Sequence, residues 1–438
     1  MAIVEKTSAA SPRIVVIGAG MSGICLAIRL RQEGFTNVTV YEKSQRPGGT
    51  WNYNAYPGSA CDVPSFLYSY SFAPNLNWSR RYAPQQEIFD YFQDCVRKFG
   101  VEGSIVYGVH VVAADYDEST RRWRVELSTC EVTEADVLVS AVGQLNIPKF
   151  PNVPGRESFG GTQFHAARWD NSCELRGKRV AIIGNAATTI QLLLPVAEQA
   201  AQVTVFQRSP NYVMAKKDRA YSGLTKGLFR VIPGLAKLYR WNIFWNNEIR
   251  FLAFRRQTFI SDWFGGIVRW RMRRQVPRES KLISKVVPMN FPAGCKRILL
   301  SDDYLQTIQR PNVELVTEKV NAIDATGVQT TAGHRNFDVI IYATGFVSNP
   351  LISDIRVAGR GGELLGDAWR ERPLAYLGML TPGFPNFFAL YGPNTNLGHN
   401  SIIFMVECQV NYLIRTLRWR AQQGATNRGQ RSRGRRLS

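Results

Sequence analysis

Two copies of one short glycine-containing pattern constrain this chain of 438 residues more than any other feature. The first copy, GAGMSG at residues 18–23, directly follows an apolar run at 14–17, and the second, GNAATT at 184–189, follows one at 180–183. A strand, a tight turn and a helix N-terminus in this order form a site for a pyrophosphate, because glycine admits close approach and the helix dipole attracts the anion. The loop residues expected to contact two bound nucleotides are Gly18, Gly20, Gly23, Gly184, Ala187 and Thr188.

The residue that ends the next expected strand differs in charge between the two copies. Glu42 follows Gly18 by 24 residues, and Arg208 follows Gly184 by the same interval. A carboxylate accepts hydrogen bonds from free ribose hydroxyls, which suits FAD or NAD, whereas a guanidinium pairs with the 2′-phosphate of NADP. Two such sites in one chain predict electron transfer between two bound dinucleotides.

The repeat extends beyond the two loops. Residues 136–143 (DVLVSAVG) and 338–345 (DVIIYATG) each place alanine five residues and glycine seven residues after an aspartate. Each is an apolar strand that ends in a small-residue turn, where the backbone has to approach a ligand or another segment closely. The sequence therefore predicts an α/β protein with two Rossmann-like, doubly wound, three-layer dinucleotide-binding domains.

The order of the motifs also predicts how the chain is divided. Residues 1–145 are expected to form the first part of the FAD-binding domain, including a β-excursion near 105–128. The segments expected after it are a linker at 146–177, an NADPH-binding domain at 178–350 with a basic, aromatic helical insert at about 212–290, a return to the first domain at 351–420, and a basic disordered tail at 421–438.

The net charge of +20 is concentrated in two segments. Residues 216–285 carry 17 Lys or Arg against four acids, and residues 415–438 carry eight Arg and no acid. The first segment interleaves its basic residues with Trp241, Phe244, Trp245, Phe251, Phe254, Trp263, Phe264 and Trp270. This composition suits peripheral contact with an anionic membrane or admission of an apolar substrate, although a helical cap with a solvated basic face is the more frequent case. No recognised nucleic-acid-binding module accompanies the charge, so no nucleic-acid partner is expected.

The cysteines argue against metal or dithiol chemistry. No pair is closer than Cys61 and Cys95, so neither a zinc site nor a redox disulfide is predicted. A disulfide reductase shares the two-dinucleotide plan but needs a close cysteine pair, which this sequence does not contain. The pattern fits a reducing cytosol, and we expect a cytoplasmic protein. The first 13 residues contain no apolar signal region, and no stretch has the character of a membrane span.

A segment between the two loops carries a more specific resemblance. Its sequence FGGTQFHAARWD fits the pattern FxGxxxHxxxW(P/D) through Phe159, Gly161, His165, Trp169 and Asp170. The chain thereby resembles the type I Baeyer–Villiger monooxygenases of the class B flavin-containing monooxygenase family. Further agreement lies in GGTW at 48–51, YPG at 56–58, FQRSP at 206–210, GCKR at 294–297 and ATGF at 343–346.

The resemblance implies FAD and NADPH as cofactors and O₂ as co-substrate. NADPH would reduce FAD, and the reduced flavin would capture O₂ as a C4a-peroxide that inserts one oxygen atom into a ketone, giving an ester or lactone. The family's active-site arginine corresponds to Arg297 and its partner aspartate to Asp62, and the guanidinium would stabilise both the peroxide and the substrate oxyanion. The aromatic content suggests a bulky, apolar ketone, and His165 is assigned a conformational role.

The resemblance also assigns positions to the two cofactors. For FAD or NADPH these are Glu42, Lys43, Gly49, Thr50, Trp51, Asp62, Tyr68, Val111, Arg208, Ser209, Lys296, Ala343, Thr344, Gly345, Asn394 and Leu397. Arg208, Ser209 and Lys296 are the expected contacts of the NADPH 2′-phosphate.

Two features depart from the family. Ala186 and Thr189 stand where the family has glycine, and glycine or alanine, so we expect a displaced pyrophosphate and looser helix–strand packing in the second loop. The family usually continues after its last helix with a segment that helps to close the active site, and here an arginine-rich tail follows. Two other functions stay open: N- or S-oxygenation of soft nucleophiles, and a catalytically impaired flavin-binding protein held at a membrane or polyanion by its basic segments.

Overall fold

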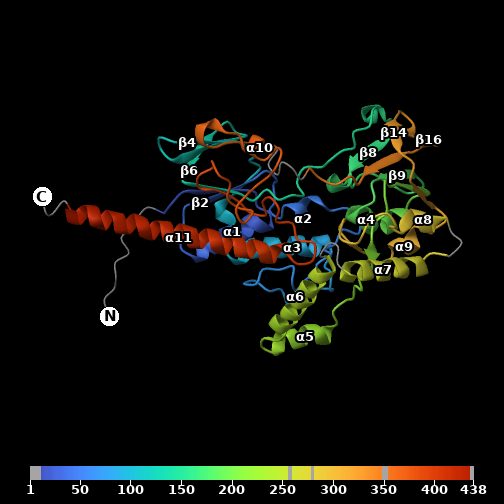
Figure 1. Cartoon of the computed structure of the whole chain (residues 1–438), viewed down its shortest axis with the longest axis horizontal. Coiled ribbons are helices and arrows are strands. Elements are labelled where there is room, and N and C mark those ends of the chain that lie inside the picture. Colours follow the sequence, from blue (N-terminus) through green and yellow to red (C-terminus); the bar gives the residue numbers. More distant parts are fainter. Residues whose placement is uncertain (1–10, 255–258, 278–280, 348–353, 435–438) are drawn as a thin grey trace.

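The computed structural model describes residues 11–254, 259–277, 281–347 and 354–434, and it contains two five-stranded parallel sheets (Figure 1). The parts of the expected ranges at 1–10, 348–353 and 435–438 lie outside the described residues, as does the side chain of Phe254. The first sheet, in the order β19-β7-β1-β2-β3, consists of β1 (Ile14–Ile17), β2 (Val38–Glu42), β3 (Ile105–Tyr107), β7 (Val137–Ser140) and β19 (Phe387–Ala389).

The first sheet is covered on both faces, because alternate residues of its central strand enter different cores. Ile14 and Val16 pack in the same core as the helices α1 and α11, whereas Val15 and Ile17 pack against a second, four-stranded sheet. The helices of this part are α1 (Met21–Gln32), α2 (Thr50–Tyr53), α3 (Gln85–Lys98), α10 (Leu365–Ala368) and α11 (Ile402–Gly434), with 3₁₀ turns η1 (Glu102–Ser104) and η4 (Arg360–Gly362).

The four-stranded sheet is the expected β-excursion, placed further along the chain than predicted. Its strands are β4 (Val111–Asp117), β5 (Arg122–Leu127), β6 (Val132–Ala135) and β18 (Arg356–Ala358), in the order β18-β4-β5-β6. Residues 105–107 are instead the edge strand β3 of the parallel sheet, where Ile105 pairs with Val40. The short apolar run IVY suits a partly buried edge strand, so the excursion starts only after it.

The second parallel sheet repeats the first. Its order is β13-β10-β9-β17-β8, with β8 (Thr162–His165), β9 (Arg179–Ile183), β10 (Gln202–Phe206), β13 (Val313–Val316) and β17 (Val339–Tyr342). Val180 and Ile182 enter one core, and Ala181 and Ile183 enter another, which is the alternation of the first sheet. The remaining elements here are α4 (Ala187–Ala197), α9 (Tyr304–Thr307), the two-stranded pair β11 (Val213–Met214) and β12 (Leu299–Leu300), the antiparallel sheet β14 (Val320–Ile323), β15 (Gly327–Thr330) and β16 (Gly333–Asn336), and turns η2 (Arg156–Ser158) and η3 (Ala166–Arg168).

The segment expected to be a linker therefore contributes a strand. β8 pairs in parallel with β17, so that residues 162–165 form the edge of the second sheet. The sequence TQFH offers alternating side chains to the two faces, and an edge position tolerates its polar members. The segment joins the two halves of the chain through this strand.

Hydrogen bonds reproduce the sequence repeat. The backbone N–H of Arg13, before β1, donates to Asp136 Oδ2 at 2.8 Å, and the N–H of Arg179, at the start of β9, donates to Asp338 Oδ2 at 2.8 Å. Each aspartate thus ties the central strand of its sheet to the neighbouring strand. The repeated Asp at 136 and 338 has this structural role in both halves.

The helical insert and the C-terminal helix complete the chain. Among its described residues, the insert contains four helices: α5 (Gly223–Val231), α6 (Leu235–Phe254), α7 (Phe259–Arg274) and α8 (Leu282–Val286). The expectation of a disordered tail differs from the structure, in which α11 runs on to Gly434 and projects from the body (Figure 1). Alanine, glutamine and arginine favour helix, and each of Gly424 and Gly429 costs only about 1 kcal/mol. None of the helices within the described ranges is long and apolar enough to cross a membrane.

Candidate active site

A cavity of about 360 Å³ lies where the two glycine-containing loops meet. Its wall includes Gly18 and Gly20 from the first loop and Ala186, Ala187 and Thr188 from the second. The expected site residues that line it are Gly18, Gly20, Glu42, Lys43, Gly49, Thr50, Trp51, Asp62, Tyr68, Val111, Ala187, Thr188, Arg297, Ala343, Gly345 and Leu397. Residues far apart in the sequence are thereby brought to one site.

The first loop is shaped by two close backbone approaches. Gly18 has φ +100°, and a Cβ there would lie 2.9 Å from the carbonyl oxygen of Ala141, at the end of β7. A Cβ on Gly23 would lie 1.9 Å from the carbonyl oxygen of Gly18, so α1 can pack against the loop only with glycine at this position. At Gly20 a Cβ would meet only Gly49, at 3.6 Å, which leaves the N-terminus of α1 accessible from the cavity.

Glu42 is buried at the end of β2 and holds the loop in place. Its Oε2 accepts a hydrogen bond from the N–H of Ala19 at 2.7 Å, and its Oε1 accepts one from the N–H of Ser44 at 2.9 Å. Each carboxylate oxygen keeps a further lone pair for a ribose hydroxyl in the cavity. The residues of this region therefore fit the adenosine and pyrophosphate parts of FAD.

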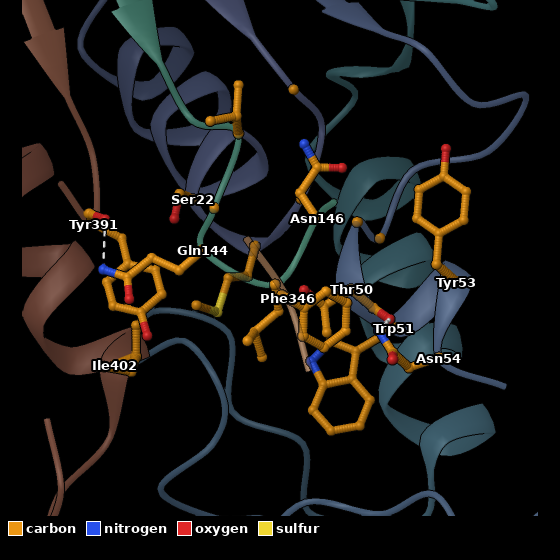
Figure 2. Close-up of a pocket in the computed structure, with 18 of the residues that line it drawn as sticks. Ser22, Thr50, Trp51, Tyr53, Asn54, Gln144, Asn146, Phe346, Tyr391 and Ile402 are labelled. Carbon is orange, nitrogen blue, oxygen red and sulfur yellow. Dashed lines mark hydrogen bonds between the residues drawn. The ribbon is translucent and has the colours of Figure 1, made fainter. Parts of the chain in front are cut away.

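Aromatic and amide side chains form the wall near residues 48–54 (Figure 2). The indole N–H of Trp51 donates to the Tyr68 hydroxyl at 3.0 Å, and the two rings meet edge to face at 5.6 Å. Burial raises the pKa of Tyr68, so its hydroxyl stays protonated. The cavity wall also includes Tyr56 and Phe346, which lie within the predicted YPG and ATGF motifs. The cavity residues that the sequence did not single out as site residues include Tyr53, Asn54, Gln144, Asn146, Gln191, Tyr391, Asn396 and Ile402. Several of them directly adjoin motif residues in the sequence, and this proximity is the signal by which they could have been predicted.

The central pair of the cavity is Arg297 with Asp62. The Arg297 guanidinium donates to Asp62 Oδ2 and forms an ion pair with it, although 235 positions separate the two residues. The Asp62 charge raises the pKa of Arg297, so the guanidinium is permanently protonated. The Arg297 side chain remains 53% exposed, so it has donors to spare for a ligand.

The second loop differs from the first at its third glycine position. Thr189 is fully buried, and its hydroxyl donates to the carbonyl oxygen of Gly184 at 2.9 Å. The expectation that Thr189 loosens the packing is therefore wrong, because its hydroxyl bonds the carbonyl of Gly184, the counterpart of the Gly18 carbonyl that excludes a side chain from Gly23 in the first loop. Ala186 is the N-cap residue that precedes α4, with extended backbone angles of φ −129° and ψ −158°, and it lines the cavity.

Three expected NADPH residues gather beyond the end of β10. Lys296 Nζ donates to the Ser209 hydroxyl and, at 3.4 Å, to the carbonyl oxygen of Pro210. Desolvation, together with the nearby charge of Arg208, lowers the pKa of Lys296. Two neighbouring cations and a hydroxyl are the donor set that a phosphate monoester requires, so these residues fit the 2′-phosphate of NADPH.

Phe159 and Gly161 have packing roles. Phe159 is buried in the core under the β14–β16 sheet. A Cβ on Gly161 would lie 2.5 Å from the carbonyl oxygen of Asp338 and 2.8 Å from the Phe159 ring, so the glycine permits both contacts.

His165 is buried beneath the turn that follows β17. Its Nδ1 accepts a hydrogen bond from the N–H of Ala167 at 3.1 Å, and its ring meets those of Phe150 and Phe346 edge to face. Burial, reinforced by the charge of Arg168, lowers its pKa to about 4, so the ring is neutral at physiological pH.

The end of the same segment is a turn. Trp169 packs its ring edge to face on Phe164 at 5.0 Å, and Asp170 Oδ1 accepts hydrogen bonds from the N–H and hydroxyl of Ser172. Arg168 lies over the ring of Tyr53 at 4.1 Å, which connects the segment to the cavity wall.

The other expected site residues lie outside the cavity wall. Asn394 has φ +61°, and its side-chain amide donates to the carbonyl oxygen of Pro373 at 2.8 Å, while Asn396 lines the cavity. The Thr344 hydroxyl donates to the carbonyl oxygen of Lys149. Within the described ranges no three His, Cys, Asp or Glu side chains are grouped as metal ligands, and all seven cysteines are free.

Comparison with known proteins decides the family. A Baeyer–Villiger monooxygenase of Streptomyces coelicolor is 38% identical over 407 residues, which cover 93% of this chain and 78% of that protein. The chain belongs to the Baeyer–Villiger monooxygenase family. Residues 15–226 also match the family described as pyridine nucleotide-disulphide oxidoreductase.

Solved structures agree with this membership. The protein OTEMO in complex with FAD and NADP superimposes with a TM-score of 0.86 at 29% identity, covering 95% of this chain and 86% of that one. The open form of cyclohexanone monooxygenase gives a TM-score of 0.84 at 27% identity, covering 94% and 88%. The predicted family, fold class and enzyme class, a flavin-dependent monooxygenase, are thus confirmed.

Proposed function

We propose that this chain binds FAD and NADPH and uses O₂ to insert one oxygen atom into an apolar ketone, giving an ester or lactone. The observation that carries the proposal is the Arg297–Asp62 ion pair in the wall of a cavity shared by both nucleotide loops. Membership of the Baeyer–Villiger monooxygenase family and the likeness to cyclohexanone monooxygenase support it.

FAD would be held by residues 18–23, Glu42 and residues 48–51. The N-terminus of α1 attracts its pyrophosphate, and Glu42 accepts from its ribose. When bound and reduced by NADPH, FAD would supply the electrons that activate O₂ for the transfer. NADPH would be held by the N-terminus of α4 and by the cluster of Arg208, Ser209 and Lys296, whose positive charge favours the 2′-phosphate over the free hydroxyl of NADH.

Arg297 would act on the ketone. Its guanidinium stays charged, and its unpaired N–H donors face the cavity, where negative charge develops on the carbonyl oxygen under attack. Asp62 orients the guanidinium and keeps it protonated without taking part itself. The apolar side chains of the wall favour an apolar ketone: Met21, Trp51, Val63, Leu145, Phe346, Leu397 and Ile402.

The test measures ester formation by the purified holoprotein with NADPH and a panel of cyclic and aromatic ketones. Arg297→Ala is expected to keep FAD and its reduction by NADPH, while ester formation falls about 10²–10³-fold because a donor to the oxyanion is lost. Arg297→Lys retains the charge but not the planar fork, so a partial loss is expected. Arg360→Ala, which removes an exposed arginine outside the cavity wall, is the matched control.

The outcomes separate the open alternatives. If Arg297→Ala forms esters at the wild-type rate, Arg297 does not stabilise the oxyanion in the oxygen transfer. Sulfoxides or N-oxides formed without esters would favour oxygenation of soft nucleophiles. A bound flavin that NADPH does not bleach would favour the catalytically impaired flavin-binding protein.

A further inference from the structure

The helices α5 and α6 project from the body at the lower edge of Figure 1 and carry an apolar outer face. Its members are 43% to 78% exposed: Leu224, Leu228, Val231, Ile232, Leu238, Trp241, Trp245 and Ile249. Monomeric soluble proteins rarely expose so many large apolar side chains together, and such patches mark interaction surfaces. We call these eight residues the apolar ridge.

The spacing on α6 shows that the ridge is a separate face. Leu238, Trp241, Trp245 and Ile249 follow one another at intervals of three and four residues, so they share one side of the helix. The opposite side faces the body, where Ile243 is buried in the first core. The inward face of α6 is therefore already packed, and the ridge is additional apolar surface.

The body holds α6 firmly. The guanidinium of Arg240 donates to the carbonyl oxygens of Phe66 at 2.7 Å and Ser69 at 2.8 Å. Phe244 packs on Phe404 of α11, with the ring centroids 5.0 Å apart. Because α6 is anchored at these points, the ridge is presented in a fixed orientation.

The charge around the ridge is positive. Arg230 and Lys237 are exposed on α5 and α6, next to the ridge residues along the chain. Both acids between residues 216 and 254 are engaged: Asp218 pairs with Arg80 at 3.2 Å, and Glu248 accepts from the amide of Asn400. The Arg230 guanidinium donates to Asn77 Oδ1, with Nε at 3.1 Å, but this partner is a neutral amide, so the positive charges of Arg230 and Lys237 remain available to a negatively charged partner.

We propose that the apolar ridge is the site at which this protein docks on an anionic lipid surface. Tryptophan favours the boundary between head groups and acyl chains, and leucine, valine and isoleucine enter below it, while lysine and arginine extend to the phosphates. A projecting, convex face suits a fluid bilayer, whereas a folded protein partner would need a matching groove. Docking is independent of the reaction proposed above.

The experiment uses the FAD-loaded full chain and sedimentation with two kinds of vesicle. One kind is phosphatidylcholine alone, and the other contains about 30% phosphatidylserine, because the attraction to anionic lipid is worth about 1 kcal/mol per basic residue. The variant Trp241→Ser/Trp245→Ser removes two members of the ridge. Trp419→Ser is the matched control, because Trp419 is 62% exposed, close to the 58% of Trp245, but lies on α11 beside the arginine-rich tail.

The wild-type chain is expected to sediment with the phosphatidylserine vesicles, and brominated acyl chains are expected to quench its tryptophan fluorescence. The double variant should bind about tenfold more weakly and lose most of the quenching, since two large apolar side chains no longer enter the bilayer. Trp419→Ser should bind as the wild type does. Flavin absorbance verifies that each variant is folded.

Three results would overturn the proposal. One is absence of binding to the phosphatidylserine vesicles. Another is equal binding by the double variant, or loss of binding in Trp419→Ser, which would assign adsorption to the tail of α11. The third is a dimer in analytical ultracentrifugation that the double variant dissociates, because a second copy of the chain would then occupy the ridge.

Discussion

The buried imidazole of His165 makes the stability of this fold dependent on pH. Burial lowers its pKa from 6.5 to about 4, whereas an unfolded chain exposes it to water. Because the folded pKa is the lower one, the stabilisation is complete above pH 6.5 and is lost as the pH falls from 6.5 towards 4. The linkage relation gives a total loss of about 3 kcal/mol, of which about 2 kcal/mol falls between pH 7 and pH 5.

The assay is urea unfolding of the wild type and His165→Phe at several pH values between 7 and 5. Phenylalanine keeps the edge-to-face contacts with Phe150 and Phe346 but does not titrate. Carboxylates titrate in both proteins, so their effect cancels in the difference, and the wild type should lose about 2 kcal/mol more than the variant. Replacement of the partly exposed His110 by Gln controls for the loss of an imidazole that water reaches. Parallel pH curves for wild type and His165→Phe would refute the reasoning.

The remaining predictions concern the two nucleotide sites. Gly23→Ala forces a Cβ to within 1.9 Å of the Gly18 carbonyl oxygen, so the purified protein should lose most of its FAD absorbance; full retention would contradict the assigned packing. Arg208→Ala combined with Lys296→Met should abolish the preference for NADPH over NADH in flavin reduction, and an unchanged ratio of kcat/KM would place the 2′-phosphate elsewhere. Ala186→Gly should strengthen the binding of the nicotinamide dinucleotide about two- to fivefold, because its pyrophosphate can approach the N-terminus of α4 more closely. The measurement is a titration of the oxidised holoprotein with NADP⁺, and weaker binding would show that the Cβ of Ala186 does not obstruct the pyrophosphate.

Local patterns carried most of what the sequence could predict. The two loops, their flanking strands and the paired segments at 136–143 and 338–345 fall within short stretches whose spacing is set by backbone geometry, and the structure arranges them as expected. The third loop position in the second half was misjudged. Thr189 is β-branched and was expected to loosen the packing, yet its hydroxyl donates to the carbonyl oxygen of Gly184. Helix and strand propensities do not predict a hydrogen bond of this kind.

Features that depend on tertiary pairing were the ones missed. Residues 162–165 were expected within a linker, and they are a strand only because β17 offers them an unpaired edge. Tyr391 was not singled out, although it lies in the cavity wall (Figure 2). Its backbone N–H donates to Gln409 Oε1 at 2.9 Å, and its hydroxyl donates to Asn396 Oδ1 at 3.0 Å. Its backbone has φ +56°, a left-handed conformation that is uncommon for tyrosine and that the local sequence does not indicate.

The ion pair at the centre of the cavity joins two separate cores. Cys61, next to Asp62, packs with the helices of the first sheet, whereas Ile298, next to Arg297, packs in the core of the second. The cavity therefore contains its paired arginine only while the two sheets are docked. Gln191 of α4 reinforces this docking, because it accepts from the Tyr56 hydroxyl at 2.8 Å and donates to the carbonyl oxygen of Ala60 at 3.0 Å. Because the Arg297–Asp62 ion pair forms only when the two sheets pack together, the proposed oxygen transfer requires both halves of the chain in this arrangement. The loop that would hold FAD, by contrast, is formed within the first half alone.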